Sequence, residues 1–197
     1  MNKCTIYYGM SGTLKLTTIE SLHSDSFKVF SDTKPFFKMD EDYFNWSSRP
    51  NDAHLAIHRL LTLDLPGYLP SDKDIVIERG VTDNVFCIPN RKIPGMSKYE
   101  DIDILGLVNK EESIIKSRTN NCRIIKKLLV MKDEDFISKR VLNNRYRRSI
   151  YPSITDYLAS QDKYIEFTKR YNSISEVIII NNAKDYITNI LNINYNE

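Results

Sequence analysis

The chain has few of the residues on which several common kinds of site depend. Its three cysteines, Cys4, Cys87 and Cys122, lie far apart in 197 residues and form no CxxC pair. This argues against a disulfide framework and is typical of reduced thiols in a cytoplasmic protein. No apolar run reaches the roughly 18 residues of a membrane span. No basic segment followed by a long apolar stretch opens the chain, so we expect neither a membrane anchor nor a secretory signal.

Charge of one sign is also lacking. The 28 lysines and arginines nearly balance 26 acidic residues, which leaves a net charge of +2. General nucleic-acid binders are strongly basic, so we expect no nucleic-acid partner of that kind. The sequence contains no G-x-S-x-G motif, so a nucleophilic hydrolase is not indicated. His54 and His58 are four apart on a predicted helix and could share a metal, but no third ligand is evident.

Short apolar, β-branched runs alternate with helical patterns along the chain. Such alternation is typical of a parallel sheet covered by helices on both faces. The sequence therefore predicts a single α/β domain over residues 1–197, with three layers, α/β/α, around a five-stranded parallel sheet. The predicted strands are 4–8, 27–30, 74–78, 123–131 and 176–180. The predicted helices are 14–22, 51 or 52 to 65, 105–117, 134–144, 153–171 and 184–191, with loops at 90–103 and 145–152.

The strongest chemical signal is the segment from Gly9 to Thr18, between the first predicted strand and helix. In the phosphate-binding pattern G-x-x-x-x-G-K-[ST], backbone N–H groups surround the phosphates and the lysine reaches the outer ones. Gly9 and Lys15 stand at the required separation, but Leu14 replaces the second glycine and Leu16 the hydroxyl that holds Mg²⁺. The predicted nucleotide-binding set is completed by Ser11, Gly12, Thr13, Thr17 and Thr18. The alternative is an ordinary strand–helix turn with a solvent-facing lysine.

Three further segments stand beyond predicted strands. Glu78-Arg79 ends the third strand, and Asp32 follows the second. A basic stretch follows the fourth strand and comprises Lys139, Arg140, Arg145, Arg147 and Arg148. Together with the Gly9–Thr18 loop, these segments resemble the P-loop kinases of the thymidylate kinase and deoxynucleoside kinase group.

The resemblance implies a role for each segment. Glu78 would hold Mg²⁺ or its water, and Arg79 would contact the acceptor. Asp32 would act as a base toward an accepting hydroxyl or form part of the acceptor site. A lid at about 140–152 would close Arg140 and Arg145 over the transferring phosphate. The aromatic stretch after Asp32 would stack on and orient the acceptor base, through Phe36, Phe37, Trp46 and Arg49.

The resemblance implies a cytoplasmic enzyme that moves the γ-phosphate of ATP, with Mg²⁺, to a deoxynucleoside or deoxynucleoside monophosphate. The alternative is a catalytically impaired nucleotide-binding protein, a sensor or interaction module, in which Leu14 and Leu16 abolish turnover. A third hypothesis, a nucleic-acid end kinase, is supported by the arginine cluster alone. The sequence leaves open the acceptor, its base, and whether the chain is a monomer or a homodimer.

Overall fold

The computed structural model of the protein describes residues 2–22, 25–30, 59–90 and 103–195. Five strands form one sheet in the order β2-β3-β1-β4-β5, and every neighbouring pair is parallel. The strands are β1 (Lys3–Tyr8), β2 (Phe27–Val29), β3 (Ile75–Glu78), β4 (Arg123–Met131) and β5 (Glu176–Ile180).

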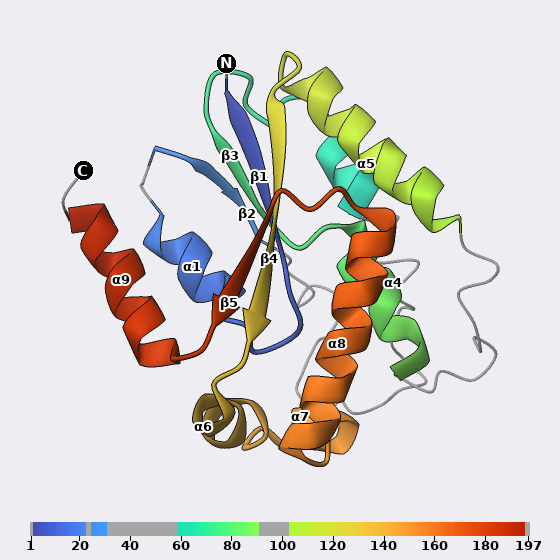
Figure 1. Ribbon diagram of the computed structural model, residues 1–197. Coiled ribbons are helices and arrows are strands. Elements are labelled where there is room, and N and C mark those ends of the chain that lie inside the picture. Colours follow the sequence, from blue (N-terminus) through green and yellow to red (C-terminus); the bar gives the residue numbers. More distant parts are fainter. Residues whose placement is uncertain (1, 23–24, 31–58, 91–102, 196–197) are drawn as a thin grey trace.

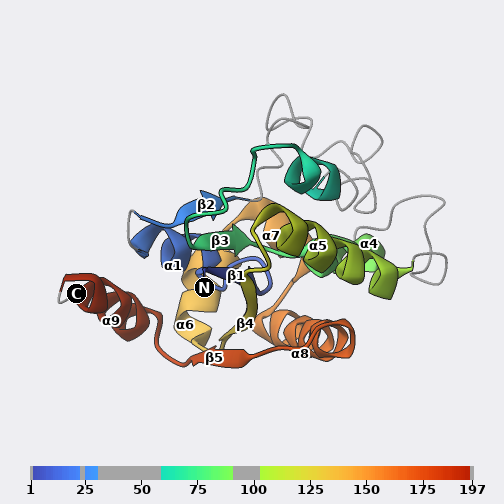
Figure 2. The ribbon, with the colours of Figure 1, turned by 90° about the horizontal axis from the view of Figure 1, so that it is seen from above.

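Helices cover both faces of the sheet. Helices α1 (Lys15–Ser21) and α9 (Ala183–Tyr195) lie on one face. Helices α4 (Val81–Asn90), α5 (Ile104–Arg118) and α8 (Ile154–Tyr171) lie on the other (Figures 1 and 2). Beyond the carboxyl end of β4 follow α6 (Glu134–Phe136), a π-helical turn at Ile137–Val141, and α7 (Arg145–Ile150). The protein therefore has the predicted three-layer α/β/α architecture.

The central strands are buried on both faces, which explains their continuous apolar runs. Ile6, Ile77, Leu128 and Met131 are fully enclosed between the two helical layers. Since β1, β3 and β4 are neighbours and parallel, the segments that follow them gather at one edge of the sheet. Ligands of open α/β sheets bind at this carboxyl edge.

Most predicted elements are confirmed. All five strands are present, although β2 and β3 are shorter than 27–30 and 74–78. Helix α8 begins where predicted, because the Ser153 hydroxyl accepts the Asp156 N–H at 3.1 Å and caps the helix. Helix α4 was not predicted from the sequence. No helix in the described ranges is long and apolar enough to cross a membrane.

Of two predictions for the segment after β4, one is wrong and one is confirmed in part. The loop predicted at 145–152 is mostly the helix α7, because the Asn144 side chain accepts the Arg147 N–H at 3.1 Å and starts a helix there. The helix predicted at 134–144 is present over 134–141, as α6 followed without a gap by a π-helical turn that a 2.9 Å bond from the Leu142 N–H to the Ile137 carbonyl closes. The first part of the helix predicted from 51 or 52, the 91–102 part of the predicted loop, and His54 and His58 lie outside the described residues.

Candidate functional site

The segment between β1 and α1 forms a tight loop. Gly9 has a φ of +154°, and a Cβ there would lie 2.4 Å from the Thr13 hydroxyl oxygen and 3.0 Å from the Leu129 carbonyl oxygen. Glycine is therefore required where the chain leaves the sheet. The Thr13 hydroxyl donates to the Met10 carbonyl at 3.0 Å and closes the loop on itself. The Thr13 side chain thus shapes the loop.

Leu14 adopts a backbone conformation typical of glycine, the residue that it replaces in the phosphate-binding pattern. Its φ of 61° and ψ of 20° are left-handed, the conformation that glycine adopts at no steric cost. A residue with a Cβ is destabilised there by about 1–2 kcal/mol. The structure thus retains a left-handed turn before Lys15 although the sequence lacks the second glycine. The departure at position 14 changes the residue and leaves the turn in place.

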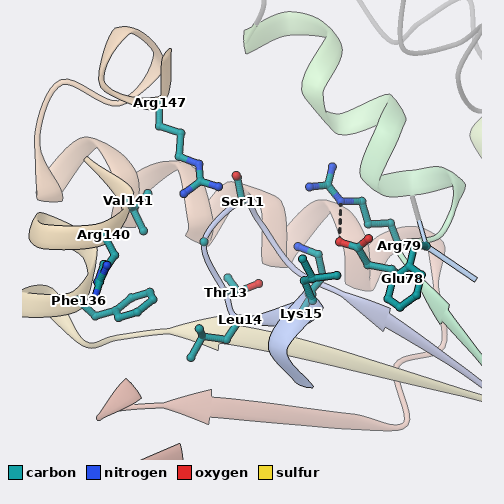
Figure 3. A pocket seen from close by; sticks show the side chains of 13 residues that line it. Ser11, Thr13, Leu14, Lys15, Glu78, Arg79, Phe136, Arg140, Val141 and Arg147 are labelled. Atoms are coloured by element: carbon teal, nitrogen blue, oxygen red, sulfur yellow. Dashed lines mark ion pairs between the residues drawn. The ribbon is translucent and has the colours of Figure 1, made fainter. Parts of the chain in front are cut away.

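Lys15 is buried at the base of this loop, with 4% of its surface exposed. Its ammonium donates to the Met10 carbonyl at 2.8 Å and to the Gly9 carbonyl. Both acceptors belong to the loop, so the charge lies within the loop and faces the cavity described below (Figure 3). The solvent-facing lysine of the alternative interpretation is not what the structure shows.

The hydroxyls after Lys15 do not replace the missing one. Leu16 lines the cavity and is 48% exposed. The Thr18 hydroxyl donates to the Leu14 carbonyl at 2.8 Å and lies 3.0 Å from the Tyr186 hydroxyl of α9. The Thr18 hydroxyl is thus engaged within the protein, and Thr18 does not line the cavity. Thr17 and Gly9 do not line the cavity either, whereas the predicted residues 11–16 all line it.

A cavity of about 540 Å³ opens over the loop. Four basic side chains and one acidic side chain line it: Lys15, Arg79, Arg140, Arg147 and Glu78. In Figure 3 the lid arginines stand on one side of the loop and Glu78 with Arg79 on the other. Such an excess of positive charge suits a polyanion. The remaining lining residues are Ser11, Gly12, Thr13, Leu14, Leu16, Phe30, Phe136 and Val141.

Glu78 and Arg79 lie at the carboxyl end of β3, as predicted. Their side chains form an ion pair with 3.8 Å between Arg79 Nε and Glu78 Oε1. Arg79 has a φ of 67°, and its N–H donates to the Tyr7 carbonyl at 2.9 Å, which ties this turn to β1. Strained backbone of this kind concentrates at functional sites. Arg79 and Leu14, both left-handed, line the same cavity.

Arg140 and Val141 begin the segment that the sequence predicts as a lid, and both line the cavity. Both residues belong to the π-helical turn, a geometry frequent at functional sites. Val141 packs so closely on Gly12 that a Cβ at Gly12 would lie 2.5 Å from Val141 Cγ2. The π-helical turn therefore packs directly on the loop after β1. Arg140 lines the cavity as expected, whereas Arg147 of α7 was not among the predicted catalytic arginines.

The remaining predicted residues cannot be placed. The side chain of Arg145, at the start of α7, lies outside the described part of the structure. The proposed acceptor residues Asp32, Phe36, Trp46 and Arg49, with Phe37, fall in 31–58 and are also outside it.

A residue that the sequence reasoning missed is Asp83 of α4, which is buried behind the loop. Burial raises the pKa of Asp83 to about 6, against the opposing charges of Lys15 and Arg79.

The cavity fits Mg²⁺ only in part. Glu78 is the one carboxylate that lines it among the described residues, and no cluster of three or more potential ligands occurs in these parts of the chain. Leu16 supplies no oxygen. Mg²⁺ commonly keeps several waters and takes its other ligands from substrate phosphates. The residues present thus fit a metal held mainly by a bound nucleotide and water, with Glu78 as the protein ligand.

Comparisons with known proteins support the fold. No protein-family profile and no curated protein sequence matches the chain. The structure resembles thymidylate kinase from Candida albicans, with 14% identity and a TM-score of 0.55 over 99% of this chain and 92% of that one. Shikimate kinase from Acinetobacter baumannii, in complex with shikimate, shows 13% identity and a TM-score of 0.42 over 100% and 94%, a likeness too distant to support a statement. The parallel sheet, the loop after β1 and the first likeness together define a P-loop NTPase fold.

Proposed function

We propose that the protein is a phosphotransferase that moves the γ-phosphate of ATP to a deoxynucleoside or deoxynucleoside monophosphate. The observation that carries the proposal is the convergence of Lys15, Arg79, Arg140 and Arg147 on one cavity over the phosphate loop. These cations come from three separate parts of the chain. Phosphoryl transfer is catalysed mainly by positioning and by charge around the transferring group, and this arrangement supplies both.

The loop and the lid would contact different parts of the ATP triphosphate. Lys15 would exchange a carbonyl partner for an outer phosphate oxygen of ATP, while the loop amides hold the inner phosphates. Arg140 and Arg147 would neutralise charge that develops on the γ-phosphoryl oxygens. Glu78 would hold Mg²⁺, which when bound would supply positive charge beside the phosphates.

The acceptor would approach from the side of Arg79. An acceptor oxygen forms a bond to the γ-phosphorus as the bond to the bridging oxygen breaks and ADP leaves. A phosphate acceptor needs no base for this step, whereas a hydroxyl acceptor releases a proton. Asp32 remains the proposed recipient of that proton, and Phe36, Trp46 and Arg49 remain the proposed contacts to the base. We place the reaction in the cytoplasm, where reduced thiols such as the buried Cys4 and Cys122 persist.

One observation favours a second candidate, a nucleotide-binding protein with impaired catalysis. Leu16 lines the cavity where a metal-binding hydroxyl belongs. A Leu16→Ser variant distinguishes the two candidates. For an active kinase we expect a change in rate of no more than a few-fold, because the phosphates and Glu78 already hold the metal. A gain of a hundredfold or more would identify a crippled site.

The decisive test is a transfer assay with labelled ATP, a panel of deoxynucleosides and their monophosphates, and Mg²⁺ present or absent. The matched variants are Arg147→Gln and Arg148→Gln, neighbours on α7 of which Arg147 lines the cavity and Arg148 is exposed. We expect Arg147→Gln to lower kcat at least tenfold, while Arg148→Gln leaves it unchanged. Binding of ATP without transfer to any acceptor would reject the enzyme in favour of the binding protein.

A further inference from the structure

Helix α8 buries side chains that carry polar atoms. Its fully buried residues are Tyr157, Gln161, Tyr164 and Thr168, all of which carry polar atoms. A surface helix ordinarily buries an apolar stripe. Spacings of three, four and seven residues place side chains on one side of a helix, so these four form a single polar stripe. Such a stripe needs partners for its polar atoms, and the loop after β1 provides two of them.

Two tyrosines of the stripe bind the loop backbone directly. The Tyr157 hydroxyl donates to the Ser11 carbonyl at 3.1 Å, and the Tyr164 hydroxyl accepts the Gly9 N–H at 2.8 Å. Between them, Gln161 accepts the Met131 N–H and donates to the Met131 carbonyl, both at 2.8 Å. The helix therefore holds the end of β4 and both ends of the first loop turn.

Asp83 fixes the direction of the contact at Gly9. The Tyr164 hydroxyl donates its proton to Asp83 Oδ1, so its oxygen is turned to accept the Gly9 N–H. Both side chains are almost completely buried, Asp83 at 3% and Tyr164 at 2% exposure. Since α4 packs against α8, the chain of bonds joins three elements: α4, α8 and the phosphate loop.

We propose that Tyr164 and Asp83 are positioning residues that hold the first turn of the phosphate loop in the shape that receives a triphosphate. Neither residue lines the cavity, so each acts through Gly9. Because α8 begins directly after the lid helix α7, the same helix that fixes the loop also anchors the lid's return to the sheet (Figure 1). The effect of Tyr164 and Asp83 on the order of the loop in the free protein does not depend on the proposed function. Only their effect on nucleotide affinity rests on the proposed function.

This chain of hydrogen bonds predicts which substitutions disorder the loop and which do not. Tyr164→Phe leaves the Gly9 N–H without its partner and frees the loop to leave its bound shape. Asp83→Asn keeps an oxygen that can accept the Tyr164 proton, whereas Asp83→Leu removes it. Asn at position 83 should therefore preserve loop order, and leucine should lose it. Tyr171→Phe is the matched control, because it removes a hydroxyl from the same helix, and the Tyr171 ring packs beside Phe167.

Two measurements on the full chain test the proposal. The first is hydrogen exchange at the amides of 9–14 in the free protein, with the amides of β4 and α5 as an internal reference. The second is the affinity for ATP by calorimetry. For Tyr164→Phe and Asp83→Leu we expect loop exchange at least tenfold faster, unchanged reference amides, and about tenfold weaker ATP binding. Asp83→Asn and Tyr171→Phe should stay within twofold of the natural protein.

Each other outcome is decisive. Unchanged loop exchange in Tyr164→Phe overturns the proposal, and so does equal acceleration in β4 and α5, which would mean general loosening. If Asp83→Leu does not fold, Tyr164→Phe and Asp83→Asn still give the answer. Faster loop exchange in a protein that binds no ATP in any form would leave the positioning role standing and reject the proposed function.

Discussion

Leu14 offers a direct test of the loop geometry, because two substitutions there separate backbone strain from side-chain packing. Leu14→Ala and Leu14→Gly both remove the isobutyl side chain, which packs partly against the core. They differ in the Cβ that the left-handed backbone, with φ of 61°, disfavours. The difference between these variants therefore isolates the strain.

At position 14 we expect the difference in stability between alanine and glycine to have the opposite sign from that at an ordinary helix position. Left-handed strain disfavours alanine by about 1–2 kcal/mol, and the greater freedom of glycine in the unfolded chain offsets about 0.4–1 kcal/mol of this. The glycine variant should therefore be more stable than the alanine variant by about 0.5–1 kcal/mol. Leu16, two residues on and inside α1, is the matched control. There alanine should be more stable than glycine by about 0.5–1 kcal/mol.

Urea unfolding at constant m-value measures both differences as shifts in the midpoint. Opposite signs at positions 14 and 16 are the predicted result. If alanine is the more stable residue at both positions, Leu14 is right-handed in solution. The loop would then lack the turn that brings Lys15 to the cavity, and the phosphate site would not exist as described.

Two further predictions concern the lid and the buried carboxylates. A Cβ at Gly12, whose φ is +92°, would lie 2.5 Å from Val141 Cγ2, so Gly12→Ala should cost about 2 kcal/mol of stability. Adding Val141→Ala should restore part of the loss in a double-mutant cycle, whereas additive losses would contradict the contact. Burial raises the pKa of Glu111 from 4.5 to about 7, so its contribution to stability is present below pH 4.5 and is lost as the pH rises through 7. Glu111→Gln should thus be more stable than the natural protein by about 3 kcal/mol at pH 8, with little difference at pH 4.5. An equal difference at both pH values in urea unfolding would show that charge is not the cause.

The sheet could be predicted from the sequence because its strands are short apolar runs that no other element explains. The tight loop between β1 and α1 could be predicted from the spacing of Gly9 and Lys15 behind the first run, and its binding of phosphate stays a prediction. Its conformation could not, because leucine at position 14 is a poor indicator of a left-handed turn and only the surrounding loop imposes it. The same holds for Arg79, whose positive φ is fixed by the bond from its N–H to β1.

The arginines of the lid show where local patterns stop being sufficient. The basic stretch was evident, but which arginine faces the cavity depends on the phase of α7. That phase is set by the Asn144 cap, and asparagine is a common capping residue that indicates a helix start. Asp83 and Tyr164 are 81 residues apart and meet only because α4 packs on α8. No spacing within the chain predicts such a pair.

The most direct test of the central claim is the binding of ATP to the free protein, measured by calorimetry with Mg²⁺ for the natural chain, Lys15→Met and Lys132→Met. Lys132 is the control because it is a 40% exposed lysine paired with Asp162 at 3.5 Å, and it does not line the cavity. We predict that ATP binds the natural protein and Lys132→Met equally, and Lys15→Met at least tenfold more weakly. ATP binding that survives intact in Lys15→Met, or that is missing from the natural protein, would contradict the account.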